Sequence, residues 1–352
     1  MIDQQAPSSL IPARARLSFV AGIPSFRSYY VAYLASEVLR RCYGSVDTIG
    51  FASTSDDIVE RIEGAGAKVL FCDLPNRDAV SFALGTNEPI LFVEEDLVVA
   101  ARQFMKSRGC GARDAAIVMS QCYAALTPLR EGSQAVAIAF DQSESAADVA
   151  EMVAKALKIS PEQWASVRRA FVKECRLERP AAEAIIEFSL SIIVIEDEPG
   201  DDEEALLSQL ETAFQFATDG ALDRLTVPLA MLHGGPPLHA PVGDDIDLTG
   251  PARCLSFGPY LRLPEGPWEV RFEFMSWGND SHNTLEFDAV ENGFVVGGQT
   301  VNLVESGHFS VSFLFAVNDR MAALELRSHL SVGAINGGFK LIAVEVCSAR
   351  HF

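Results

Sequence analysis

The first 232 residues of this 352-residue chain contain no histidine. The six histidines all lie further along, at positions 233, 239, 282, 308, 329 and 351. This absence excludes an imidazole base from the first two thirds of the chain, so a general base there must be a carboxylate. The motifs GxxxxGK followed by Ser or Thr, GxGxxG after a strand, GxSxG and HExxH are missing too. Their absence argues against the common phosphate-loop, dinucleotide, serine-hydrolase and zinc-protease sites.

Basic residues are scarce: 28 Lys and Arg stand against 48 Asp and Glu, which gives a net charge of -20. Binding to a nucleic-acid backbone requires a basic face, so we expect no nucleic acid partner. The longest apolar run, FSLSIIVI at 188–195, is much shorter than the roughly 18 residues that a membrane span needs. The N-terminus lacks the basic start and apolar core of a signal peptide, so we expect a cytoplasmic protein without a membrane span.

The seven cysteines are odd in number, scattered, and never arranged as CxxC. We therefore expect reduced thiols, no disulfide framework and no zinc site. The acidic run EDEPGDDEE at 196–204 places negative charge where a helix would begin, and the helix dipole favours charge of that sign there. We expect this run to be a solvated helix start and not a metal site.

The pattern of apolar and polar residues changes near residue 232. Up to residue 232, short apolar runs alternate with segments of helical periodicity, such as LSFVAGIP followed by SYYVAYLASEVLRR. This alternation predicts an α/β domain with a three-layer parallel sheet over residues 1–232. A Gly- and Pro-rich linker is predicted at 233–250. In residues 251–352 runs such as WEVRFEF and FSVSFLFAV alternate apolar and polar side chains, which predicts an all-β antiparallel sandwich.

The first domain resembles the P-loop-like sulfotransferases. Where that family has a loop P-K/R-S-G-T-T after its first strand, this chain reads VAGIPSFRSYYVAYL. The family's R-x-P-x-D-x-x-x-S motif has DLPNRDAVS as its counterpart, in which Pro75 and Ser81 match and Asp78 lies beside the position of the acid. The segment QAVAIAFDQSESAADVAEMVAKALKISPEQW is similar to the family's later strand and helix. The resemblance covers about the first two hundred residues and implies a phosphoadenosine-type donor.

Two departures argue against that donor. Asp73 stands where the family has an arginine on the donor's 3′-phosphate, and at about 4 Å a carboxylate repels a phosphate by roughly 4 kcal/mol at an effective dielectric of 20. The glycine of the first loop is also missing, and Arg27 or Tyr29 takes its place. We therefore expect a degenerate domain with no cofactor. Pro75, Asp78 and Ser81 then have structural roles: ending the strand, charging the first helical turn, and facing a buried backbone group.

The alternative is an active transferase with a non-standard anionic donor. In that case the resemblance assigns Arg27, Ser28 and Ser81 to phosphate. Glu94 and Glu95, at the end of the strand PILFVEED, are the candidate catalytic bases, since active sites of α/β folds gather at the carboxyl ends of strands. Charges at a strand end are also common as simple loop solvation.

The segment CLSFGPYLRLPEGPWEVRFEF resembles C-terminal β-sandwich modules of bacterial surface-polysaccharide enzymes, which are similar to carbohydrate-binding modules. Sugar recognition uses a flat aromatic ring beside planar polar side chains. The candidates are Tyr260, Trp277, Asp280, His282 and Asn283. Trp268 falls on the apolar side of an alternating run and is expected in the core, whereas Trp277 lies in a turn and is expected at the surface. Asp280 and His282 alone are too few for a metal site.

The sequence thus favours a glycan-recognising or organising protein of bacterial surface-polysaccharide metabolism with a degenerate sulfotransferase-like domain. Carbohydrate is the expected partner. An active sulfotransferase or other glycan-modifying transferase remains the alternative. A third interpretation makes the Phe-rich sandwich a homo-oligomerisation platform without a ligand.

Overall fold

The computed structural model describes residues 16–50, 58–59, 62, 66–72, 74–132, 135–141, 143–192, 200–219, 224–237, 239, 242–280 and 282–349. The chain divides into two compact units. The first consists of Met1–Cys110 and Ala125–Pro199, and the second of Gly111–Ala124 and Gly200–Phe352. The chain therefore passes from one unit to the other at three points: just before α5 (Ala112–Glu131), inside that helix, and just before the acidic helix start.

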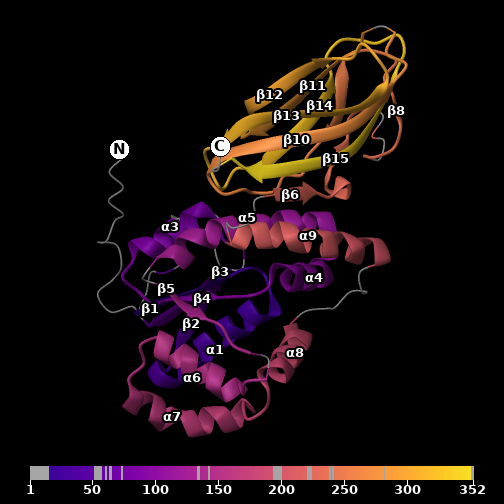
Figure 1. The fold of residues 1–352 in the computed structure, drawn as a ribbon. Coiled ribbons are helices and arrows are strands. Elements are labelled where there is room, and N and C mark those ends of the chain that lie inside the picture. The colour runs from indigo at the N-terminus through magenta and orange to yellow at the C-terminus, as the bar shows by residue number, and fades with distance from the viewer. Residues whose placement is uncertain are drawn as a thin grey trace. The chain divides into compact units, whose positions relative to one another are not determined.

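The first unit is an α/β fold around a parallel sheet with the strand order β2-β3-β1-β4-β5. Figure 1 shows α1 and α6 on one side of this sheet and α3 and α4 on the other. The elements from the N-terminus to α8 are β1 (Arg16–Gly22), α1 (Phe26–Tyr43), β2 (Val46–Gly50), β3 (Ala67–Cys72), α3 (Arg77–Gly85), β4 (Ile90–Val93), α4 (Leu97–Arg108), α5 (Ala112–Glu131), β5 (Ala135–Ile138), α6 (Ala146–Ala156), α7 (Pro161–Glu174) and α8 (Ala181–Ile192).

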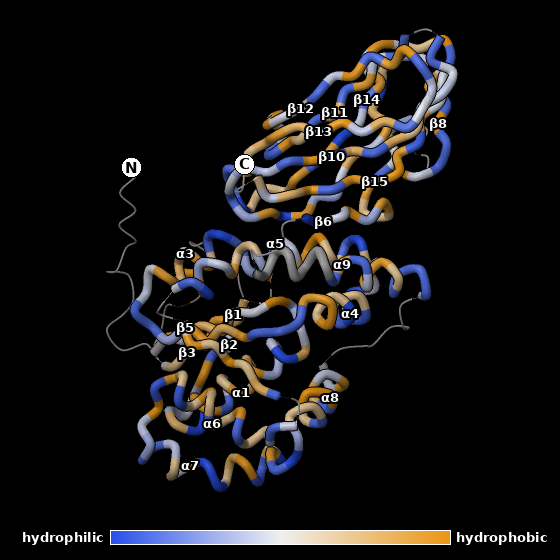
Figure 2. Tube along the Cα trace, in the orientation of Figure 1, coloured by the Kyte–Doolittle hydropathy of each residue, from blue (hydrophilic) through white to orange (hydrophobic). Residues whose placement is uncertain are grey.

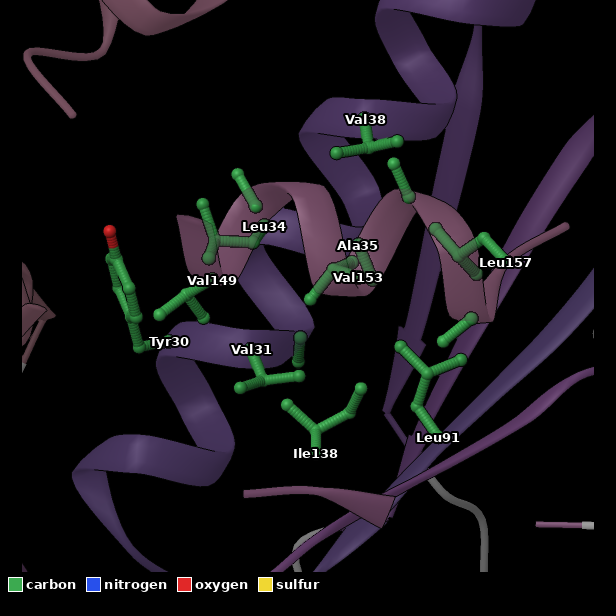
Figure 3. Close-up of a cluster of buried hydrophobic side chains, with 14 of the residues drawn as sticks. Tyr30, Val31, Leu34, Ala35, Val38, Leu91, Ile138, Val149, Val153 and Leu157 are labelled. Carbon is green, nitrogen blue, oxygen red and sulfur yellow. The ribbon is translucent and has the colours of Figure 1, made fainter. Parts of the chain in front are cut away.

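The central strands are apolar throughout because helices cover both faces of the sheet. In β4, for example, all four residues of ILFV are buried. On the α1 side, one stripe of α1 packs against α6, and α1 also contacts α7 and α8. Figure 3 shows this cluster, in which side chains of α1 meet those of α6 and of strands β4 and β5: Tyr30, Val31, Leu34, Ala35, Val38, Leu91, Ile138, Val149, Val153 and Leu157.

The second unit is an antiparallel β-sandwich with α9 and the first part of α5. One sheet has the order β13-β10-β15-β6, with β8 paired to β15, and the other has the order β12-β11-β14-β9-β7. Its further elements are α9 (Asp201–Asp219), β6 (Arg224–Val227), the 3₁₀ turn η1 (Leu229–Met231), β7 (His233–Gly234), β8 (Ile246–Asp247), β9 (Arg253–Phe257), β10 (Gly266–Trp277), β11 (Thr284–Glu291), β12 (Phe294–Asn302), β13 (Gly307–Val317), β14 (Leu324–Leu330) and β15 (Gly338–Ser348).

The period-2 pattern of β10 sorts its side chains between the core and the solvent. Trp268, Val270, Phe272 and Phe274 are buried, as predicted. Phe272 and Phe274 pack on Phe287 of the facing sheet, with ring centroids 4.9 and 5.1 Å apart. Along β10 the colour changes between hydrophobic and hydrophilic (Figure 2), which is the expected signature of a strand with one solvated face.

The acidic run at 196–204 is a further prediction with an outcome in the structure. Helix α9 begins at Asp201 with four acidic residues in its first turn, which confirms the acidic run as a helix start. Within the described ranges, no group of three His, Cys, Asp or Glu side chains could hold a metal ion. All seven cysteines lie in described parts of the chain, and none forms a disulfide.

The segment 233–250, predicted as a linker, contributes β7 and β8 to the two sheets of the second unit. Among the helices that the structure describes, none combines the length and hydropathy of a bilayer-spanning segment.

Candidate functional sites

The carboxyl edge of the parallel sheet is the first candidate site. The chain leaves β1 toward α1 on one face and leaves the neighbouring strand β4 toward α4 on the other (Figure 1). Loops that diverge in this way open the crevice in which α/β folds bind ligands. Residues 25–28, 94–96 and 140–141 follow β1, β4 and β5 at this edge.

Arg27 is held by three contacts at this edge. Its guanidinium carbon lies 4.8 Å from the ring centroid of Phe140, a distance at which the cation interacts with the ring. Nη1 donates to the backbone carbonyl of Glu94 at 3.1 Å, and Nε lies 3.4 Å from Oε2 of Glu95. The structure thus brings together Arg27, Glu94 and Glu95, but the arginine faces its own chain and only 16% of its side chain is exposed.

The three carboxylates after β4 have different surroundings. Glu94 is exposed. The side chain of Glu95 is only 7% exposed, and burial raises the pKa of its carboxyl, while the neighbouring Arg27 offsets part of that rise. Asp96 caps α4, because Oδ1 accepts from the amides of Val98 and Val99. Glu95 therefore has a perturbed carboxyl of the kind that acid–base chemistry uses.

Two backbone amides at the start of α1 donate hydrogen bonds to side chains of the same protein. The amide of Phe26 donates to Oε1 of Gln103 at 2.7 Å, and the amide of Ser28 donates to Oγ of Ser25 at 3.1 Å. Ser28 is fully buried, and its Oγ accepts from the hydroxyl of Ser25. An ideal Cβ at Gly22 would lie 2.3 Å from that oxygen, so Ser28 packs directly on the end of β1.

This loop is not a phosphate-binding nest. A nest requires successive amides in alternating right- and left-handed conformations. In the described stretch from Gly22 to Tyr30, no residue has φ in the left-handed region. Helix N-termini attract anions through unsatisfied amides, and here Gln103 and Ser25 accept from two of those amides.

The segment that contains Pro75, Asp78 and Ser81 leads into α3. Asn76 caps this helix by accepting from the amide of Ala79, and Asp78 adds negative charge in the first turn, as expected. Ser81 is exposed, so the expectation that it faces a buried backbone group is wrong. Asp73, on which the electrostatic argument against a phosphate depends, lies outside the described residues.

Trp277, at the end of β10, is the second candidate site. It pairs with Gly338 of β15, and an ideal Cβ at that glycine would lie 2.2 Å from Cε2 of the indole. The ring therefore lies over the glycine backbone, where any other residue would displace it. Because 37% of Trp277 is exposed, as predicted, one side of a flat aromatic surface faces solvent. We call this surface the Trp277 platform.

A buried amide network supports the turn after Trp277. Asn283 Nδ2 donates to Oδ1 of Asn279 and to the carbonyl of Asn336. Asn279 Nδ2 donates to the carbonyl of Glu305, and its Oδ1 also accepts from the hydroxyl of Ser276. Both asparagines are 4% exposed. As the structure stands, Asn283 holds the loops beside the platform together and is not presented to a ligand.

Asp280 and His282 lie at the surface of the same turn. Asp280 is exposed, and its Oδ2 accepts from Nδ2 of Asn336 at 3.0 Å. His282 is exposed and adopts the left-handed conformation, with φ of 55°. The structure therefore brings together Trp277, Asp280 and His282, with Asn336 as a polar neighbour that the sequence analysis did not identify.

Tyr260 lies at the other end of the sandwich. Its amide donates to the carbonyl of Leu324, which pairs with Glu291 at the far end of β11. β11 starts shortly after Trp277 and rises about 3.4 Å per residue, so its two ends are roughly 24 Å apart and Tyr260 lies at the end away from Trp277. Tyr260 contacts Phe257 and His233, with ring centroids 6.3 and 6.0 Å away. Trp268 is in the core, as predicted.

A charged cluster on the outer side of β11 and β14 was missed in the sequence. Arg327 forms two hydrogen bonds of 2.7 Å with Asp288, and Nε2 of His329 lies 3.8 Å from that carboxylate. The side chain of Asp288 is only 5% exposed. Burial lowers the pKa of His329, which favours its neutral form. The available signal was the acidic residue within the apolar run FDAV and the ionisable residues at alternate positions of LELRSHL.

Comparison of the chain with protein-family models and with curated proteins finds no match. Solved structures similar to part of the chain include the xylan-binding module CBM15, at 8% identity and a TM-score of 0.26 over 37% of this chain and 98% of that one. They also include the C-terminal CBM6 of LamC, a laminarinase from Zobellia galactanivorans, at 12% identity and a TM-score of 0.21 over 36% and 90%.

A third similar structure is the insecticidal endotoxin Cry8Ea1 from Bacillus thuringiensis, at 16% identity and a TM-score of 0.21 over 30% of this chain. The chain spans only 19% of the endotoxin's length. Several of the similar structures are carbohydrate-binding modules. The TM-scores of these structures are all below 0.5, so the likeness alone carries no argument about function.

Proposed function

We propose that the second unit recognises carbohydrate at the Trp277 platform. The chain then acts as a glycan-recognising or organising protein, and the resemblance of its FGPYLRLPEGPW segment suggests bacterial surface-polysaccharide metabolism as the setting. In this proposal the first unit is a sulfotransferase-like domain that no longer uses a donor.

The observation that carries the proposal is the packing of Trp277 on Gly338. A sugar ring has an apolar face of C–H groups that stacks on a flat aromatic surface, and hydroxyls that need polar partners at the edge. The platform offers the aromatic surface, and polar groups are close in the chain: Asp280 follows Trp277 by three residues, and its hydrogen-bond partner Asn336 precedes Gly338 by two. The buried amides of Asn279 and Asn283 fix the surrounding loops, so little ordering would be required on binding.

The start of α1 supports the degenerate assignment of the first unit. Gln103 and Ser25 accept from amides that a donor's phosphate would otherwise use, and Ser28 is buried. Arg27 is engaged by Glu94, Glu95 and Phe140. A donor would have to break several of these contacts before it could bind at this loop.

The test is a glycan array probed with the full-length chain and two variants. Trp277→Ala removes the platform, and Leu314→Ala removes another exposed apolar side chain, 63% exposed on β13, away from Trp277. Trp277→Ala should weaken binding to the best glycan at least tenfold, since buried aromatic anchors dominate binding energy. Leu314→Ala should bind like the parent. The proposal fails if the parent binds no glycan or if Trp277→Ala binds unchanged.

A further inference from the structure

Three branched aliphatic side chains are strongly exposed in the loops at the Trp277 end of the sandwich. Val304 is 68% exposed, Val332 62% and Ile335 81%. Val304 lies between β12 and β13, and the other two lie between β14 and β15. We call these residues the aliphatic tips.

Residues next to each of the three tips form hydrogen bonds with residues 279–284. Next to Val304, the amide of Leu303 donates to the carbonyl of Asn283 and the carbonyl of Glu305 accepts from Asn279. Next to Ile335, the carbonyl of Asn336 accepts from Asn283. Next to Val332, the amide of Ser331 donates to the carbonyl of Thr284. The loops that carry the tips are therefore hydrogen-bonded to residues 279–284, which directly follow the Trp277 platform in the chain.

The charged side chains at this end are mainly acidic. Asp280 and Glu305 are exposed carboxylates on these loops. Asp247 of β8 is exposed as well and pairs with Gly338 of β15, and the exposed Asp245 just before β8 pairs with Lys340 at 3.3 Å. Arg253 donates to the backbone around Asp247. Carboxylates within a Debye length of about 8 Å repel an anionic ligand at physiological salt. A sulfated sugar or a uronic acid is therefore a poor match for this end.

We propose that the sugar bound at the platform is neutral and carries a methyl or acetyl group, as a 6-deoxyhexose or an N-acetylhexosamine does. This inference rests on the proposed function and specifies its ligand class. A hydroxymethyl group placed against the aliphatic tips would lose hydrogen bonds to water without gaining protein partners. A methyl group in the same place removes apolar surface from water on both sides of the contact.

The experiment uses pairs of methyl glycosides that differ only in this substituent: L-rhamnose with L-mannose, L-fucose with L-galactose, and N-acetylglucosamine with glucose. Glucuronic acid is the anionic comparator. Each is titrated into the full-length chain by calorimetry or ligand-observed NMR. In at least one pair, the methyl- or acetyl-bearing sugar should bind about tenfold tighter than its partner, which is the usual size of discrimination for one apolar group.

Three variants locate the effect. The first is a triple variant, Val304→Thr with Val332→Thr and Ile335→Thr. It replaces a methyl by a hydroxyl at each valine and an ethyl by a hydroxyl at the isoleucine. It should abolish the preference for the methyl- or acetyl-bearing sugar without weakening binding of the partner sugar. Trp277→Ala should weaken both members of a pair. Leu314→Thr, at an exposed site away from the tips, should change neither.

Equal affinity within every pair, a preference that survives in the triple variant, or tighter binding of glucuronic acid would overturn this inference while leaving carbohydrate recognition intact. Binding of no sugar at all would overturn the proposed function as well. The two failures are therefore distinguishable.

Discussion

At the scale of single residues, the orientation of the Trp277 indole depends on the absence of a side chain at Gly338. The indole occupies the space that a side chain at position 338 would fill, and this makes the ring lie flat on the sheet. The sequence predicted the exposure of Trp277 but wrongly placed it in a turn: it is the last residue of β10 and is paired with Gly338. Its orientation was not predictable, because it depends on a glycine in a strand far along the chain.

Gly338→Val should displace the indole and weaken glycan binding as much as Trp277→Ala does. The added Cβ would lie 2.2 Å from Cε2, a separation that real structures do not tolerate. Gly307→Ala is the matched control, since a Cβ there meets no atom nearer than 3.8 Å. Tryptophan fluorescence would report the changed environment of the ring. Unaltered glycan binding by Gly338→Val would contradict the described geometry.

Glu95 should make the stability of the first unit fall as pH rises. Its pKa in the folded chain is raised above the ordinary value of 4.5, so the folded state keeps its proton at pH values where the unfolded chain has lost it. In that window, from 4.5 up to the raised pKa, the free energy of unfolding decreases with rising pH. Glu95→Gln removes this titration and should be more stable than the parent at pH 7.

Urea unfolding followed by ellipticity at 222 nm, from pH 4 to 8, measures this difference. The advantage of Glu95→Gln should shrink toward pH 4, where both proteins carry a neutral group at this position. Glu94→Gln, at the exposed neighbouring position, is the control for the loss of one carboxylate and should leave the free energy of unfolding at pH 7 close to that of the parent. A Glu95→Gln variant that is less stable than the parent at every pH would show that the contact with Arg27 outweighs burial.

At the scale of elements, periodicity predicted most of the architecture. The apolar runs that became β1, β4 and β5 and the helical stripes of α1 and α6 were recognisable because the packing demands a regular spacing. The short strands β6, β7 and β8 were not predicted. They contain two to four residues each, too few for a period, and two of them lie in a Gly- and Pro-rich segment.

Pairing across strands explains why the cluster around Asp288 was also missed. Alternation places Asp288 and Arg327 on the outer side of their strands, where charged residues are ordinarily solvated. The register brings the two side chains opposite each other and buries the carboxylate. The pairing register of β11 and β14 cannot be derived from a single sequence.

Asp288→Ala should lower the free energy of unfolding by about 2 kcal/mol, because it leaves the partly buried Arg327 without its carboxylate. Replacing both residues, as in Asp288→Ala with Arg327→Met, should recover part of the loss. Glu286→Gln, at an exposed position of the same strand, should have little effect. Urea titration of the four proteins checks this. Equal stability of Asp288→Ala and the parent would contradict a structural role for the pair.

At the scale of the whole molecule, the net charge of -20 and the closed start of α1 both oppose an anionic donor. The charge argument was available from composition, while the role of Gln103 became visible only in the fold, since it comes from another helix. The sequence argument based on Asp73 stays a prediction, because that residue lies outside the described part of the chain.

Adenosine 3′,5′-bisphosphate at millimolar concentration should therefore leave the Tm of the full chain unchanged. A ligand present at 100 times its Kd would stabilise the folded state by about 2.7 kcal/mol, which a thermal shift assay detects readily. Inorganic phosphate at the same ionic strength controls for salt effects. A rise in Tm that depends on concentration and disappears in Arg27→Gln would show that the donor site still works.

Carbohydrate recognition at Trp277 is the central claim for the molecule as a whole. The most direct measurement is a crystal structure of the full chain with the tightest-binding glycan of the array. We predict a sugar ring stacked on the exposed face of the Trp277 indole, with hydroxyls directed toward Asp280 and Asn336. A glycan seated elsewhere, for example against Arg327 and His329 on the other sheet, with Trp277 uncovered, would contradict the account.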